Sequence, residues 1–172
     1  MASPWAKKQL HLQYYISQNN NYMPQSLAYN YIHLVFSTKY REHTILPEVE
    51  QKLYDYISGI CKNMDSPAIQ IGGITDHIHI LFVLSKNISL VYFVKEIKAS
   101  SSKWIKTQGE QYHNFYWQGG YGAFSVSPKK VDTVKRYIAN QKEHHSKLPF
   151  QKEYITFLKE YNVEYDERYV WD

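Results

Sequence analysis

Hydrophobic and polar positions change their spacing along the chain, and one kind of spacing is typical of β-strands. Residues 29–38 (YNYIHLVFST) are rich in β-branched and aromatic side chains, which favour the extended conformation. Gly72 and Gly73 interrupt a second such stretch and indicate a turn or a bulge there. The four predicted strands are residues 29–38, 68–74, 78–84 and 121–126.

Other segments repeat their apolar positions with the period of an α-helix. From Pro47 to about residue 63, apolar side chains recur at the spacing that places them on one helix face. Ser89 and the pair Ser127-Pro128 stand where the N-terminal caps of two further helices are expected. The four predicted helices are residues 47–63, 90–107, 128–145 and 150–161.

The order of these elements is β-α-β-β-α-β followed by more helices, which is the split βαβ or ferredoxin-like pattern. It predicts an α+β fold in which one antiparallel sheet carries two helices on one face, with a further C-terminal helix that bears Tyr137. Something else must cover the opposite face, and a partner chain is one option. Residues 1–22 are polar and unpatterned, so we expect an extension outside a single domain of residues 23–172.

Composition narrows the class of protein only a little. A chain of 172 residues is long enough for one domain with a real core. The single cysteine, Cys61, rules out an internal disulfide and a multi-cysteine zinc site, and it fits a reducing cytoplasm. No apolar run approaches the length of a membrane span, so we expect a cytoplasmic protein without a membrane partner.

The stretch TDHIHILF, residues 75–82, is the first candidate for chemistry. Side chains alternate along a strand, so His77 and His79 share one face, and two imidazoles on one face can bind one metal ion. The alternative is a pair of half-exposed histidines at a strand end. Asp76 stands where its carboxylate either orients an imidazole or solvates a turn, and the sequence does not separate these roles.

The stretch VKRYIANQKEHH, residues 134–145, is the second candidate. On one continuous helix Tyr137, Gln141, His144 and His145 would lie on one face. With the two strand histidines, an oxygen from Gln141 would leave room on a divalent ion such as Mg²⁺ or Mn²⁺ for a phosphate oxygen. Tyr137 would then lie beside the metal as a nucleophile, although a tyrosine at the edge of a helix also serves simply to pack.

Positive charge is the third feature, because net charge is +4 and several cations cluster. Such groups contact phosphates in nucleic-acid complexes, although a solvated helix face has the same appearance. The candidate DNA-binding residues are Lys39, Arg41, Lys95, Lys98 and Lys103.

Five stretches together resemble a known family. They are YIHLVFSTKYR, TDHIHILF, KEIKASSSKW, FYWQGGYGAFSV and the helix that carries Tyr137. They occur in the order found in the single-tyrosine HUH transposases, the small transposases of the simplest insertion sequences. The resemblance covers about residues 25–147 and leaves residues 1–22 without a match.

The resemblance implies a DNA transposase that cleaves and rejoins single-stranded DNA at hairpin-marked element ends. It implies that Tyr137 is the nucleophile, that His77, His79 and Gln141 hold Mg²⁺ or Mn²⁺, and that cleavage leaves a 5′-phosphotyrosine and a free 3′-OH. It also implies a homodimer. In many members the tyrosine helix docks on the histidines of the other subunit, so active sites shared between chains are one arrangement to expect.

Several alternatives stay open at the level of sequence. His144 or His145 can replace Gln141 as the third ligand, since many HUH enzymes use a third histidine. A domesticated relative would process chromosomal hairpin repeats with the same chemistry. A non-catalytic ferredoxin-like module would bind nucleic acid through aromatic strand residues, for which Tyr29, Tyr31 and Phe36 are candidates. A metal-dependent phosphoesterase would release its product with water and form no adduct.

Overall fold

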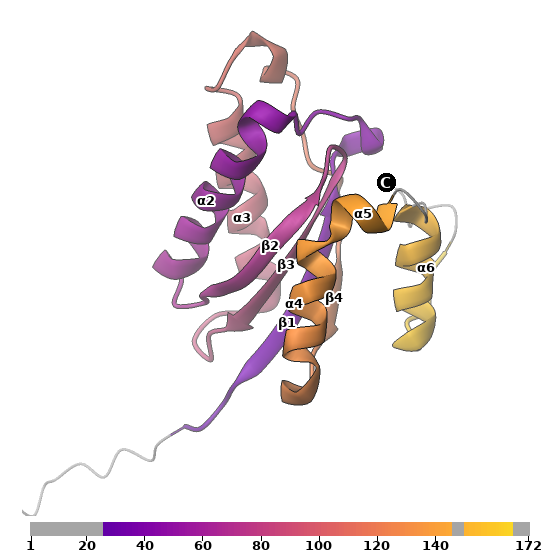
Figure 1. Ribbon diagram of the computed structural model, residues 1–172. Helices are drawn as coiled ribbons and strands as arrows, with labels where there is room; N and C mark the ends of the chain where they lie inside the picture. The colour runs from indigo at the N-terminus through magenta and orange to yellow at the C-terminus, as the bar shows by residue number, and fades with distance from the viewer. Residues whose placement is uncertain (1–25, 146–149, 167–172) are drawn as a thin grey trace, which may run out of the picture.

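A computed structural model describes residues 26–145 and 150–166 and shows a twisted antiparallel sheet between two layers of helices (Figure 1). The strands are β1 (Asn30–Ser37), β2 (Ala68–Ile74), β3 (His77–Leu84) and β4 (Gly122–Ser125). Their spatial order is β2-β3-β1-β4, and every neighbouring pair is antiparallel. The predicted strands and the ferredoxin-like fold are therefore confirmed.

The helices α2 (Pro47–Asn63) and α3 (Leu90–Ile105) lie on one face of the sheet (Figure 1). Ser89 caps α3 as expected, because its hydroxyl accepts a hydrogen bond from the Tyr92 backbone N–H at 3.3 Å. Cys61 is buried in this core, and burial raises the pKa of its thiol to about 12, so it packs as a small apolar group. The strand residues of this core are Leu34, Phe36, Ile78, Ile80 and Phe82.

Three further helices of the same chain cover the opposite face. They are α4 (Val131–Ala139), α5 (Gln141–His145) and α6 (Phe150–Glu160), drawn in orange and yellow in Figure 1. In the described part of the chain this face is therefore covered from within, and a partner is not needed to bury it.

The single helix predicted for residues 128–145 is wrong in two details. It starts with a 3₁₀ turn, η3 (Pro128–Lys130), and the Ser127 side chain makes no cap bond to it. It also breaks at Asn140, whose backbone leaves the helical region and ends α4 before α5 begins. The side chains of His144 and His145 lie outside the described residues, as do residues 1–22.

The turn or bulge predicted at Gly72 and Gly73 is also wrong, since β2 continues through both glycines. The irregular pairing lies instead between Ala68 and Gln70. Gly72 serves a close approach of α4, because a Cβ there would lie 2.5 Å from the backbone oxygen of Ile138. The glycine thus lets the helix that carries Tyr137 pack directly on the sheet.

The short 3₁₀ turns η1 (Lys39–Arg41) and η2 (Glu110–Tyr112) lie in the connections that follow β1 and α3. Tyr40 and Arg41 in η1 both have left-handed backbone angles, with φ of 56° and 57°. Among the described helices, none is both long and apolar enough to cross a membrane.

Candidate active site

Strand alternation places His77 and His79 together on the face that α4, α5 and α6 cover. Their neighbour Ile78 points into the opposite core, as the alternation requires. Both histidines are fully buried, so the alternative of half-exposed residues at a strand end is wrong.

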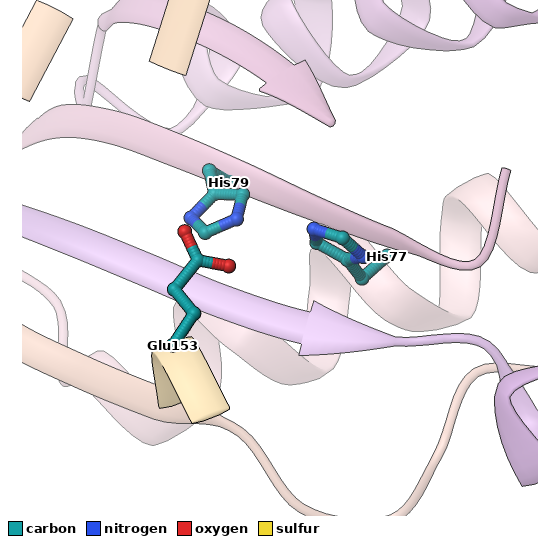
Figure 2. Close-up of side chains that lie close together, drawn as sticks. All are labelled: His77, His79 and Glu153. Atoms are coloured by element: carbon teal, nitrogen blue, oxygen red, sulfur yellow. The ribbon is translucent and has the colours of Figure 1, made fainter. Parts of the chain in front are cut away.

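A carboxylate from α6 joins the two histidines. Figure 2 shows Glu153 reaching from its helix toward the rings of His77 and His79 on β3. One ligand atom from each of the three residues lies within 4.8 Å of the others, and all three residues are buried. Burial also raises the pKa of Glu153 to about 8, because an ionised carboxylate is poorly solvated there.

Sequence reasoning missed Glu153, although a signal for it exists. Phe150, Tyr154 and Leu158 are buried on the inner face of α6, and Glu153 lies within that same apolar stripe. A glutamate inside an apolar stripe is rare unless it has a partner, so the pattern marks it as a candidate for a buried role.

Gln141 lies between the histidines and Glu153. Its Oε1 is 3.4 Å from His77 Nε2, and its Nε2 donates a hydrogen bond to Glu153 Oε1 at 3.3 Å. Gln141 is buried at the start of α5, so the break after α4 does not separate it from the strand histidines. The structure therefore brings the three sequence-predicted metal residues, His77, His79 and Gln141, together with a fourth donor.

Asp76 holds His77 from the other side. Its Oδ1 lies 2.7 Å from His77 Nδ1, and its Oδ2 accepts a hydrogen bond from Arg41 at 2.6 Å. Burial alone would raise the pKa of Asp76, but the bonds and charges of His77 and Arg41 outweigh it and lower the pKa to about 2. The Asp76 carboxylate accepts a hydrogen bond from His77 Nδ1–H, and the other ring nitrogen, Nε2, faces Gln141.

His33 on β1 makes the equivalent contact with His79. The His33 Nε2 and His79 Nδ1 atoms are 2.9 Å apart, and both rings are buried. Burial lowers the pKa of His33 to about 4, so this imidazole is neutral near pH 7 and shares one proton with its neighbour. Sequence reasoning missed His33. The alternation of side chains along residues 29–38 would have shown on which face of the sheet it lies.

Tyr137 meets the histidines within one chain. Its ring centroid lies 5.7 Å from that of His79 and 6.1 Å from that of His33, both in edge-on contacts. Phe157 of α6 packs on the same ring at 5.9 Å between centroids. The predicted nucleophile and the predicted metal residues are therefore neighbours without a second subunit.

The predicted DNA-binding residues do not gather at this cluster. Lys95, Lys98 and Lys103 lie on α3, across the sheet from the histidines. Lys98 donates to the backbone oxygens of residues 118, 119 and 120 at 2.6–3.3 Å, and burial lowers its pKa to about 8. Arg41 is bound to Asp76 and lies over the Phe150 ring, while Lys39 is exposed on η1.

The aromatic strand surface considered for a non-catalytic binding module is only partly present. Phe36 is buried against Trp117 in the α2/α3 core, so it offers no surface for a base. Tyr29 is exposed and packs edge-on against Tyr31, before and at the start of β1.

Comparison with protein families assigns the chain to a class of DNA-recombining enzymes. The family model of IS200-like transposases matches residues 26–141, and the chain belongs to that family. Membership implies cleavage and strand transfer of DNA, and enzymes of this family use a divalent metal ion.

Among known proteins, the chain is similar to the ISDra2 transposase TnpA of Deinococcus radiodurans. The two are 25% identical over 114 residues, which cover 63% of this chain and 81% of that protein.

Two solved structures share the fold. One is a candidate transposase from Deinococcus radiodurans R1, with a TM-score of 0.54 and 22% identity over 67% of this chain and 93% of the other. The second is a REP-associated tyrosine transposase bound to a REP hairpin, with a TM-score of 0.54 and 15% identity over 72% and 74% of the two chains.

Proposed function

We propose that this transposase cleaves and rejoins single-stranded DNA at hairpin-marked ends, with Tyr137 as the nucleophile. The observation that carries the proposal is the contact of the Tyr137 ring with His79, 5.7 Å between centroids, beside the cluster of His77, His79 and Glu153. A phenol next to a buried set of metal-competent groups has the arrangement that covalent catalysis at a phosphate requires.

The donor set fits a divalent cation. Two imidazole nitrogens and a carboxylate oxygen converge within 4.8 Å, and the Gln141 amide oxygen lies 3.4 Å from His77. Mixed nitrogen and oxygen donors suit Mn²⁺, while Mg²⁺ prefers oxygen, so His77 and His79 with Glu153 or Gln141 would hold either ion with different affinity. A bound ion would polarise the scissile phosphate and stabilise the charge that develops on its oxygens.

The residues of the chain have separate tasks in the reaction. The Tyr137 oxygen loses its proton and forms a bond to phosphorus, while the bond from phosphorus to the 3′ oxygen breaks. The 3′ oxygen leaves as a hydroxyl after taking up a proton, and the 5′-phosphate stays on Tyr137. Because no water enters, the 3′-OH of another strand can reverse the step and rejoin DNA. Asp76 and His33 act indirectly, since each fixes the ring of one strand histidine.

Access to this cluster requires a movement of α6. His77, His79, Gln141 and Glu153 are buried, and Phe150 stacks on His77 at 4.3 Å between centroids. We therefore infer that α6 is displaced when a DNA strand enters. Hydrogen exchange in α6 should rise when single-stranded hairpin DNA is added to the Tyr137→Phe variant, and unchanged exchange would contradict the inference.

The partners belong to the same proposal. Hairpin DNA as the substrate is supported by the REP hairpin bound to one structural neighbour, which is 15% identical to this chain and shares its fold. A homodimer is expected from the resemblance, and the contact of Tyr137 with His79 in one chain predicts that each subunit places its own tyrosine beside its own histidines before DNA enters. Light scattering with and without hairpin DNA tests the assembly, and a monomer under both conditions would contradict the dimer.

The decisive experiment is an adduct assay. The full chain is incubated with Mn²⁺ or Mg²⁺ and labelled single-stranded hairpins taken from the DNA that flanks its gene, then run on a denaturing gel. We expect a covalent protein–DNA band that Tyr137→Phe abolishes and that Tyr92→Phe, on exposed α3 surface, retains. Cleavage without an adduct, or undiminished adduct from Tyr137→Phe, would overturn the proposal. Cleavage of hairpins from the gene's own flanks would indicate a mobile element. Cleavage of repeats scattered through the chromosome would indicate a domesticated copy.

A further inference from the structure

A second pocket lies at the end of β1, apart from the buried cluster. Its volume is about 320 Å³, and it is lined by Lys39, Tyr40, Tyr116, Trp117 and Gly119. We propose that it binds one unpaired nucleobase of the DNA strand that the enzyme cleaves. This inference rests on the proposed function, which identifies the bound strand as the DNA that the enzyme cleaves. The binding of a nucleobase is argued from the geometry of the pocket.

Two of the aromatic side chains that line the pocket are exposed to solvent. Tyr40 is 75% exposed and Tyr116 is 53% exposed, although large aromatic side chains are usually much more buried. Trp117 forms the buried wall, with its indole N–H bonded to the Ser101 hydroxyl at 2.9 Å. Stacking of one base on a protein aromatic ring strengthens binding roughly five- to 150-fold and accepts any base, because every base has a π face.

Positive charge surrounds the rings. Lys106 Nζ lies 3.6 Å from the centroid of the Tyr116 ring, and Lys39 Nζ lies 5.0 Å from that of Tyr40. Among the described residues that line the pocket, none carries a carboxylate. A base on the tyrosines would therefore have ammonium groups beside its own phosphate, which is how single-strand sites combine stacking with backbone contacts.

Backbone contacts fix the walls of the pocket. Tyr40 and Arg41 both have left-handed backbone angles, which are unfavourable for residues other than glycine and persist only where surrounding contacts enforce them. The Lys39 backbone N–H donates to the Tyr116 backbone oxygen at 2.8 Å, which joins the two walls. Lys98 holds the neighbouring loop through the backbone oxygens of residues 118–120.

The same strand end also leads to the buried cluster. Arg41 follows Tyr40 directly and binds Asp76 at 2.6 Å, and Asp76 in turn contacts His77 at 2.7 Å. Ser37, near the end of β1, is the register partner of His77. The pocket and the buried cluster thus share the end of β1, and the turn that shapes the pocket also carries the arginine that holds Asp76 against His77.

The test is a coupling experiment that needs no cleavage. In the Tyr137→Phe background, binding of a fluorescent single-stranded hairpin is measured while each unpaired flanking nucleotide is replaced in turn by an abasic site. We expect one position at which the abasic site weakens binding about tenfold. Tyr40→Ala and Tyr116→Ala should each weaken binding to the intact strand similarly and should remove the effect of that abasic site.

Matched variants separate stacking from loss of structure. Tyr40→Phe and Tyr116→Phe keep the ring and should bind like the parent, while Tyr92→Ala removes an exposed tyrosine of α3 outside the pocket and should change nothing. If both alanine variants kept the full loss of binding at the abasic position, the proposal that the pocket binds a base would be overturned. It would also be overturned if no abasic position weakened binding by the parent. If no adduct formed while the tyrosine substitutions still removed the effect of the abasic site, the proposed catalysis would be overturned. The proposal that the pocket binds a base would then remain.

Discussion

Helices cover both faces of the sheet, yet around His77–Ile80 of β3 the two faces carry different kinds of side chain. On the α2/α3 face, Ile78 and Ile80 of β3 pack among leucine and phenylalanine side chains. On the α4–α6 face, the alternate residues of the same strand are His77 and His79, with Glu153 facing them. One strand thus provides an apolar core on one side and a polar cluster on the other.

This comparison shows how the fold tolerates a polar face that is buried. A polar group without a partner costs about 1–3 kcal/mol when it is removed from water. The polar face avoids much of this cost by pairing, through Asp76 with His77, His33 with His79, and Gln141 with Glu153. The apolar face contributes stability directly, while the polar face provides chemistry and depends on a complete network.

The largest effect should separate adjacent residues of β3. His79→Ala removes a proposed metal ligand, and we expect adduct formation to fall at least about a hundredfold, since a metal supplies several kcal/mol of transition-state stabilisation. Ile80→Ala should lower the free energy of unfolding by about 2–5 kcal/mol and leave adduct formation per folded molecule unchanged. Urea denaturation and the adduct gel measure the two quantities. If both variants lose activity and stability together, the faces are not separate in function.

The next effect concerns pH on the polar face. Burial lowers the pKa of His33 from 6.5 to about 4, so its contribution to stability is present above pH 6.5 and is lost as pH falls through about 4. His33→Gln keeps a hydrogen-bonding side chain and does not titrate. We expect the wild-type free energy of unfolding to fall relative to this variant by roughly 3 kcal/mol over that range. Parallel pH profiles would show that His33 is not held neutral by burial.

A smaller effect tests Glu153, which has no counterpart among the sequence-predicted ligands. Glu153→Gln removes a charged oxygen donor, and we expect Mn²⁺ affinity, measured by calorimetry, to fall at least about tenfold, the effect of losing even an outer partner of a ligand. Glu160→Gln, at the exposed end of the same helix, is the control and should bind Mn²⁺ like the parent. Equal affinity for Glu153→Gln would leave Gln141 as the oxygen donor.

The last prediction compares a glycine of β2 that faces α4 with a glycine of α2. Gly72→Ala places a methyl group 2.5 Å from the Ile138 backbone oxygen, so we expect a loss of about 1–3 kcal/mol and weaker adduct formation as α4 shifts. Gly59→Ala lies in α2 with no atom within 4 Å of the new methyl group. It should gain about 0.5–1 kcal/mol from helix propensity. Thermal unfolding measures both, and a neutral Gly72→Ala would contradict the tight packing of α4.

Much of the fold is predictable from sequence because strands and helices have characteristic local spacings. The β-branched and aromatic stretches mark all the strands, and the cap at Ser89 marks the start of α3. The break at Asn140 is not predictable in this way, because no glycine or proline lies between residues 129 and 148. Packing of α4 on β2 and of Gln141 on His77 decides it instead.

The residues of the candidate site also differ in how far local spacing predicts them. Strand alternation alone puts His77 and His79 on one face. The spacing of four residues between Tyr137 and Gln141 predicts one helix face, but the helix breaks between them, and each residue contacts the histidines from its own helix. Glu153 and His33 have partners that are distant in sequence, so the local pattern marks the face on which each side chain lies but does not identify its partner. The charge pattern predicts a DNA contact for Lys98, yet this side chain binds backbone oxygens of the loop that folds back beside it.

By itself, the sequence determined the order of the elements and the face on which each strand side chain lies, since both follow from backbone geometry repeated along the chain. Tertiary structure decided which helix covers the histidines, which carboxylate meets them and that Tyr137 reaches His79 within one chain. These contacts join residues many positions apart, so they depend on how the helices pack across the sheet.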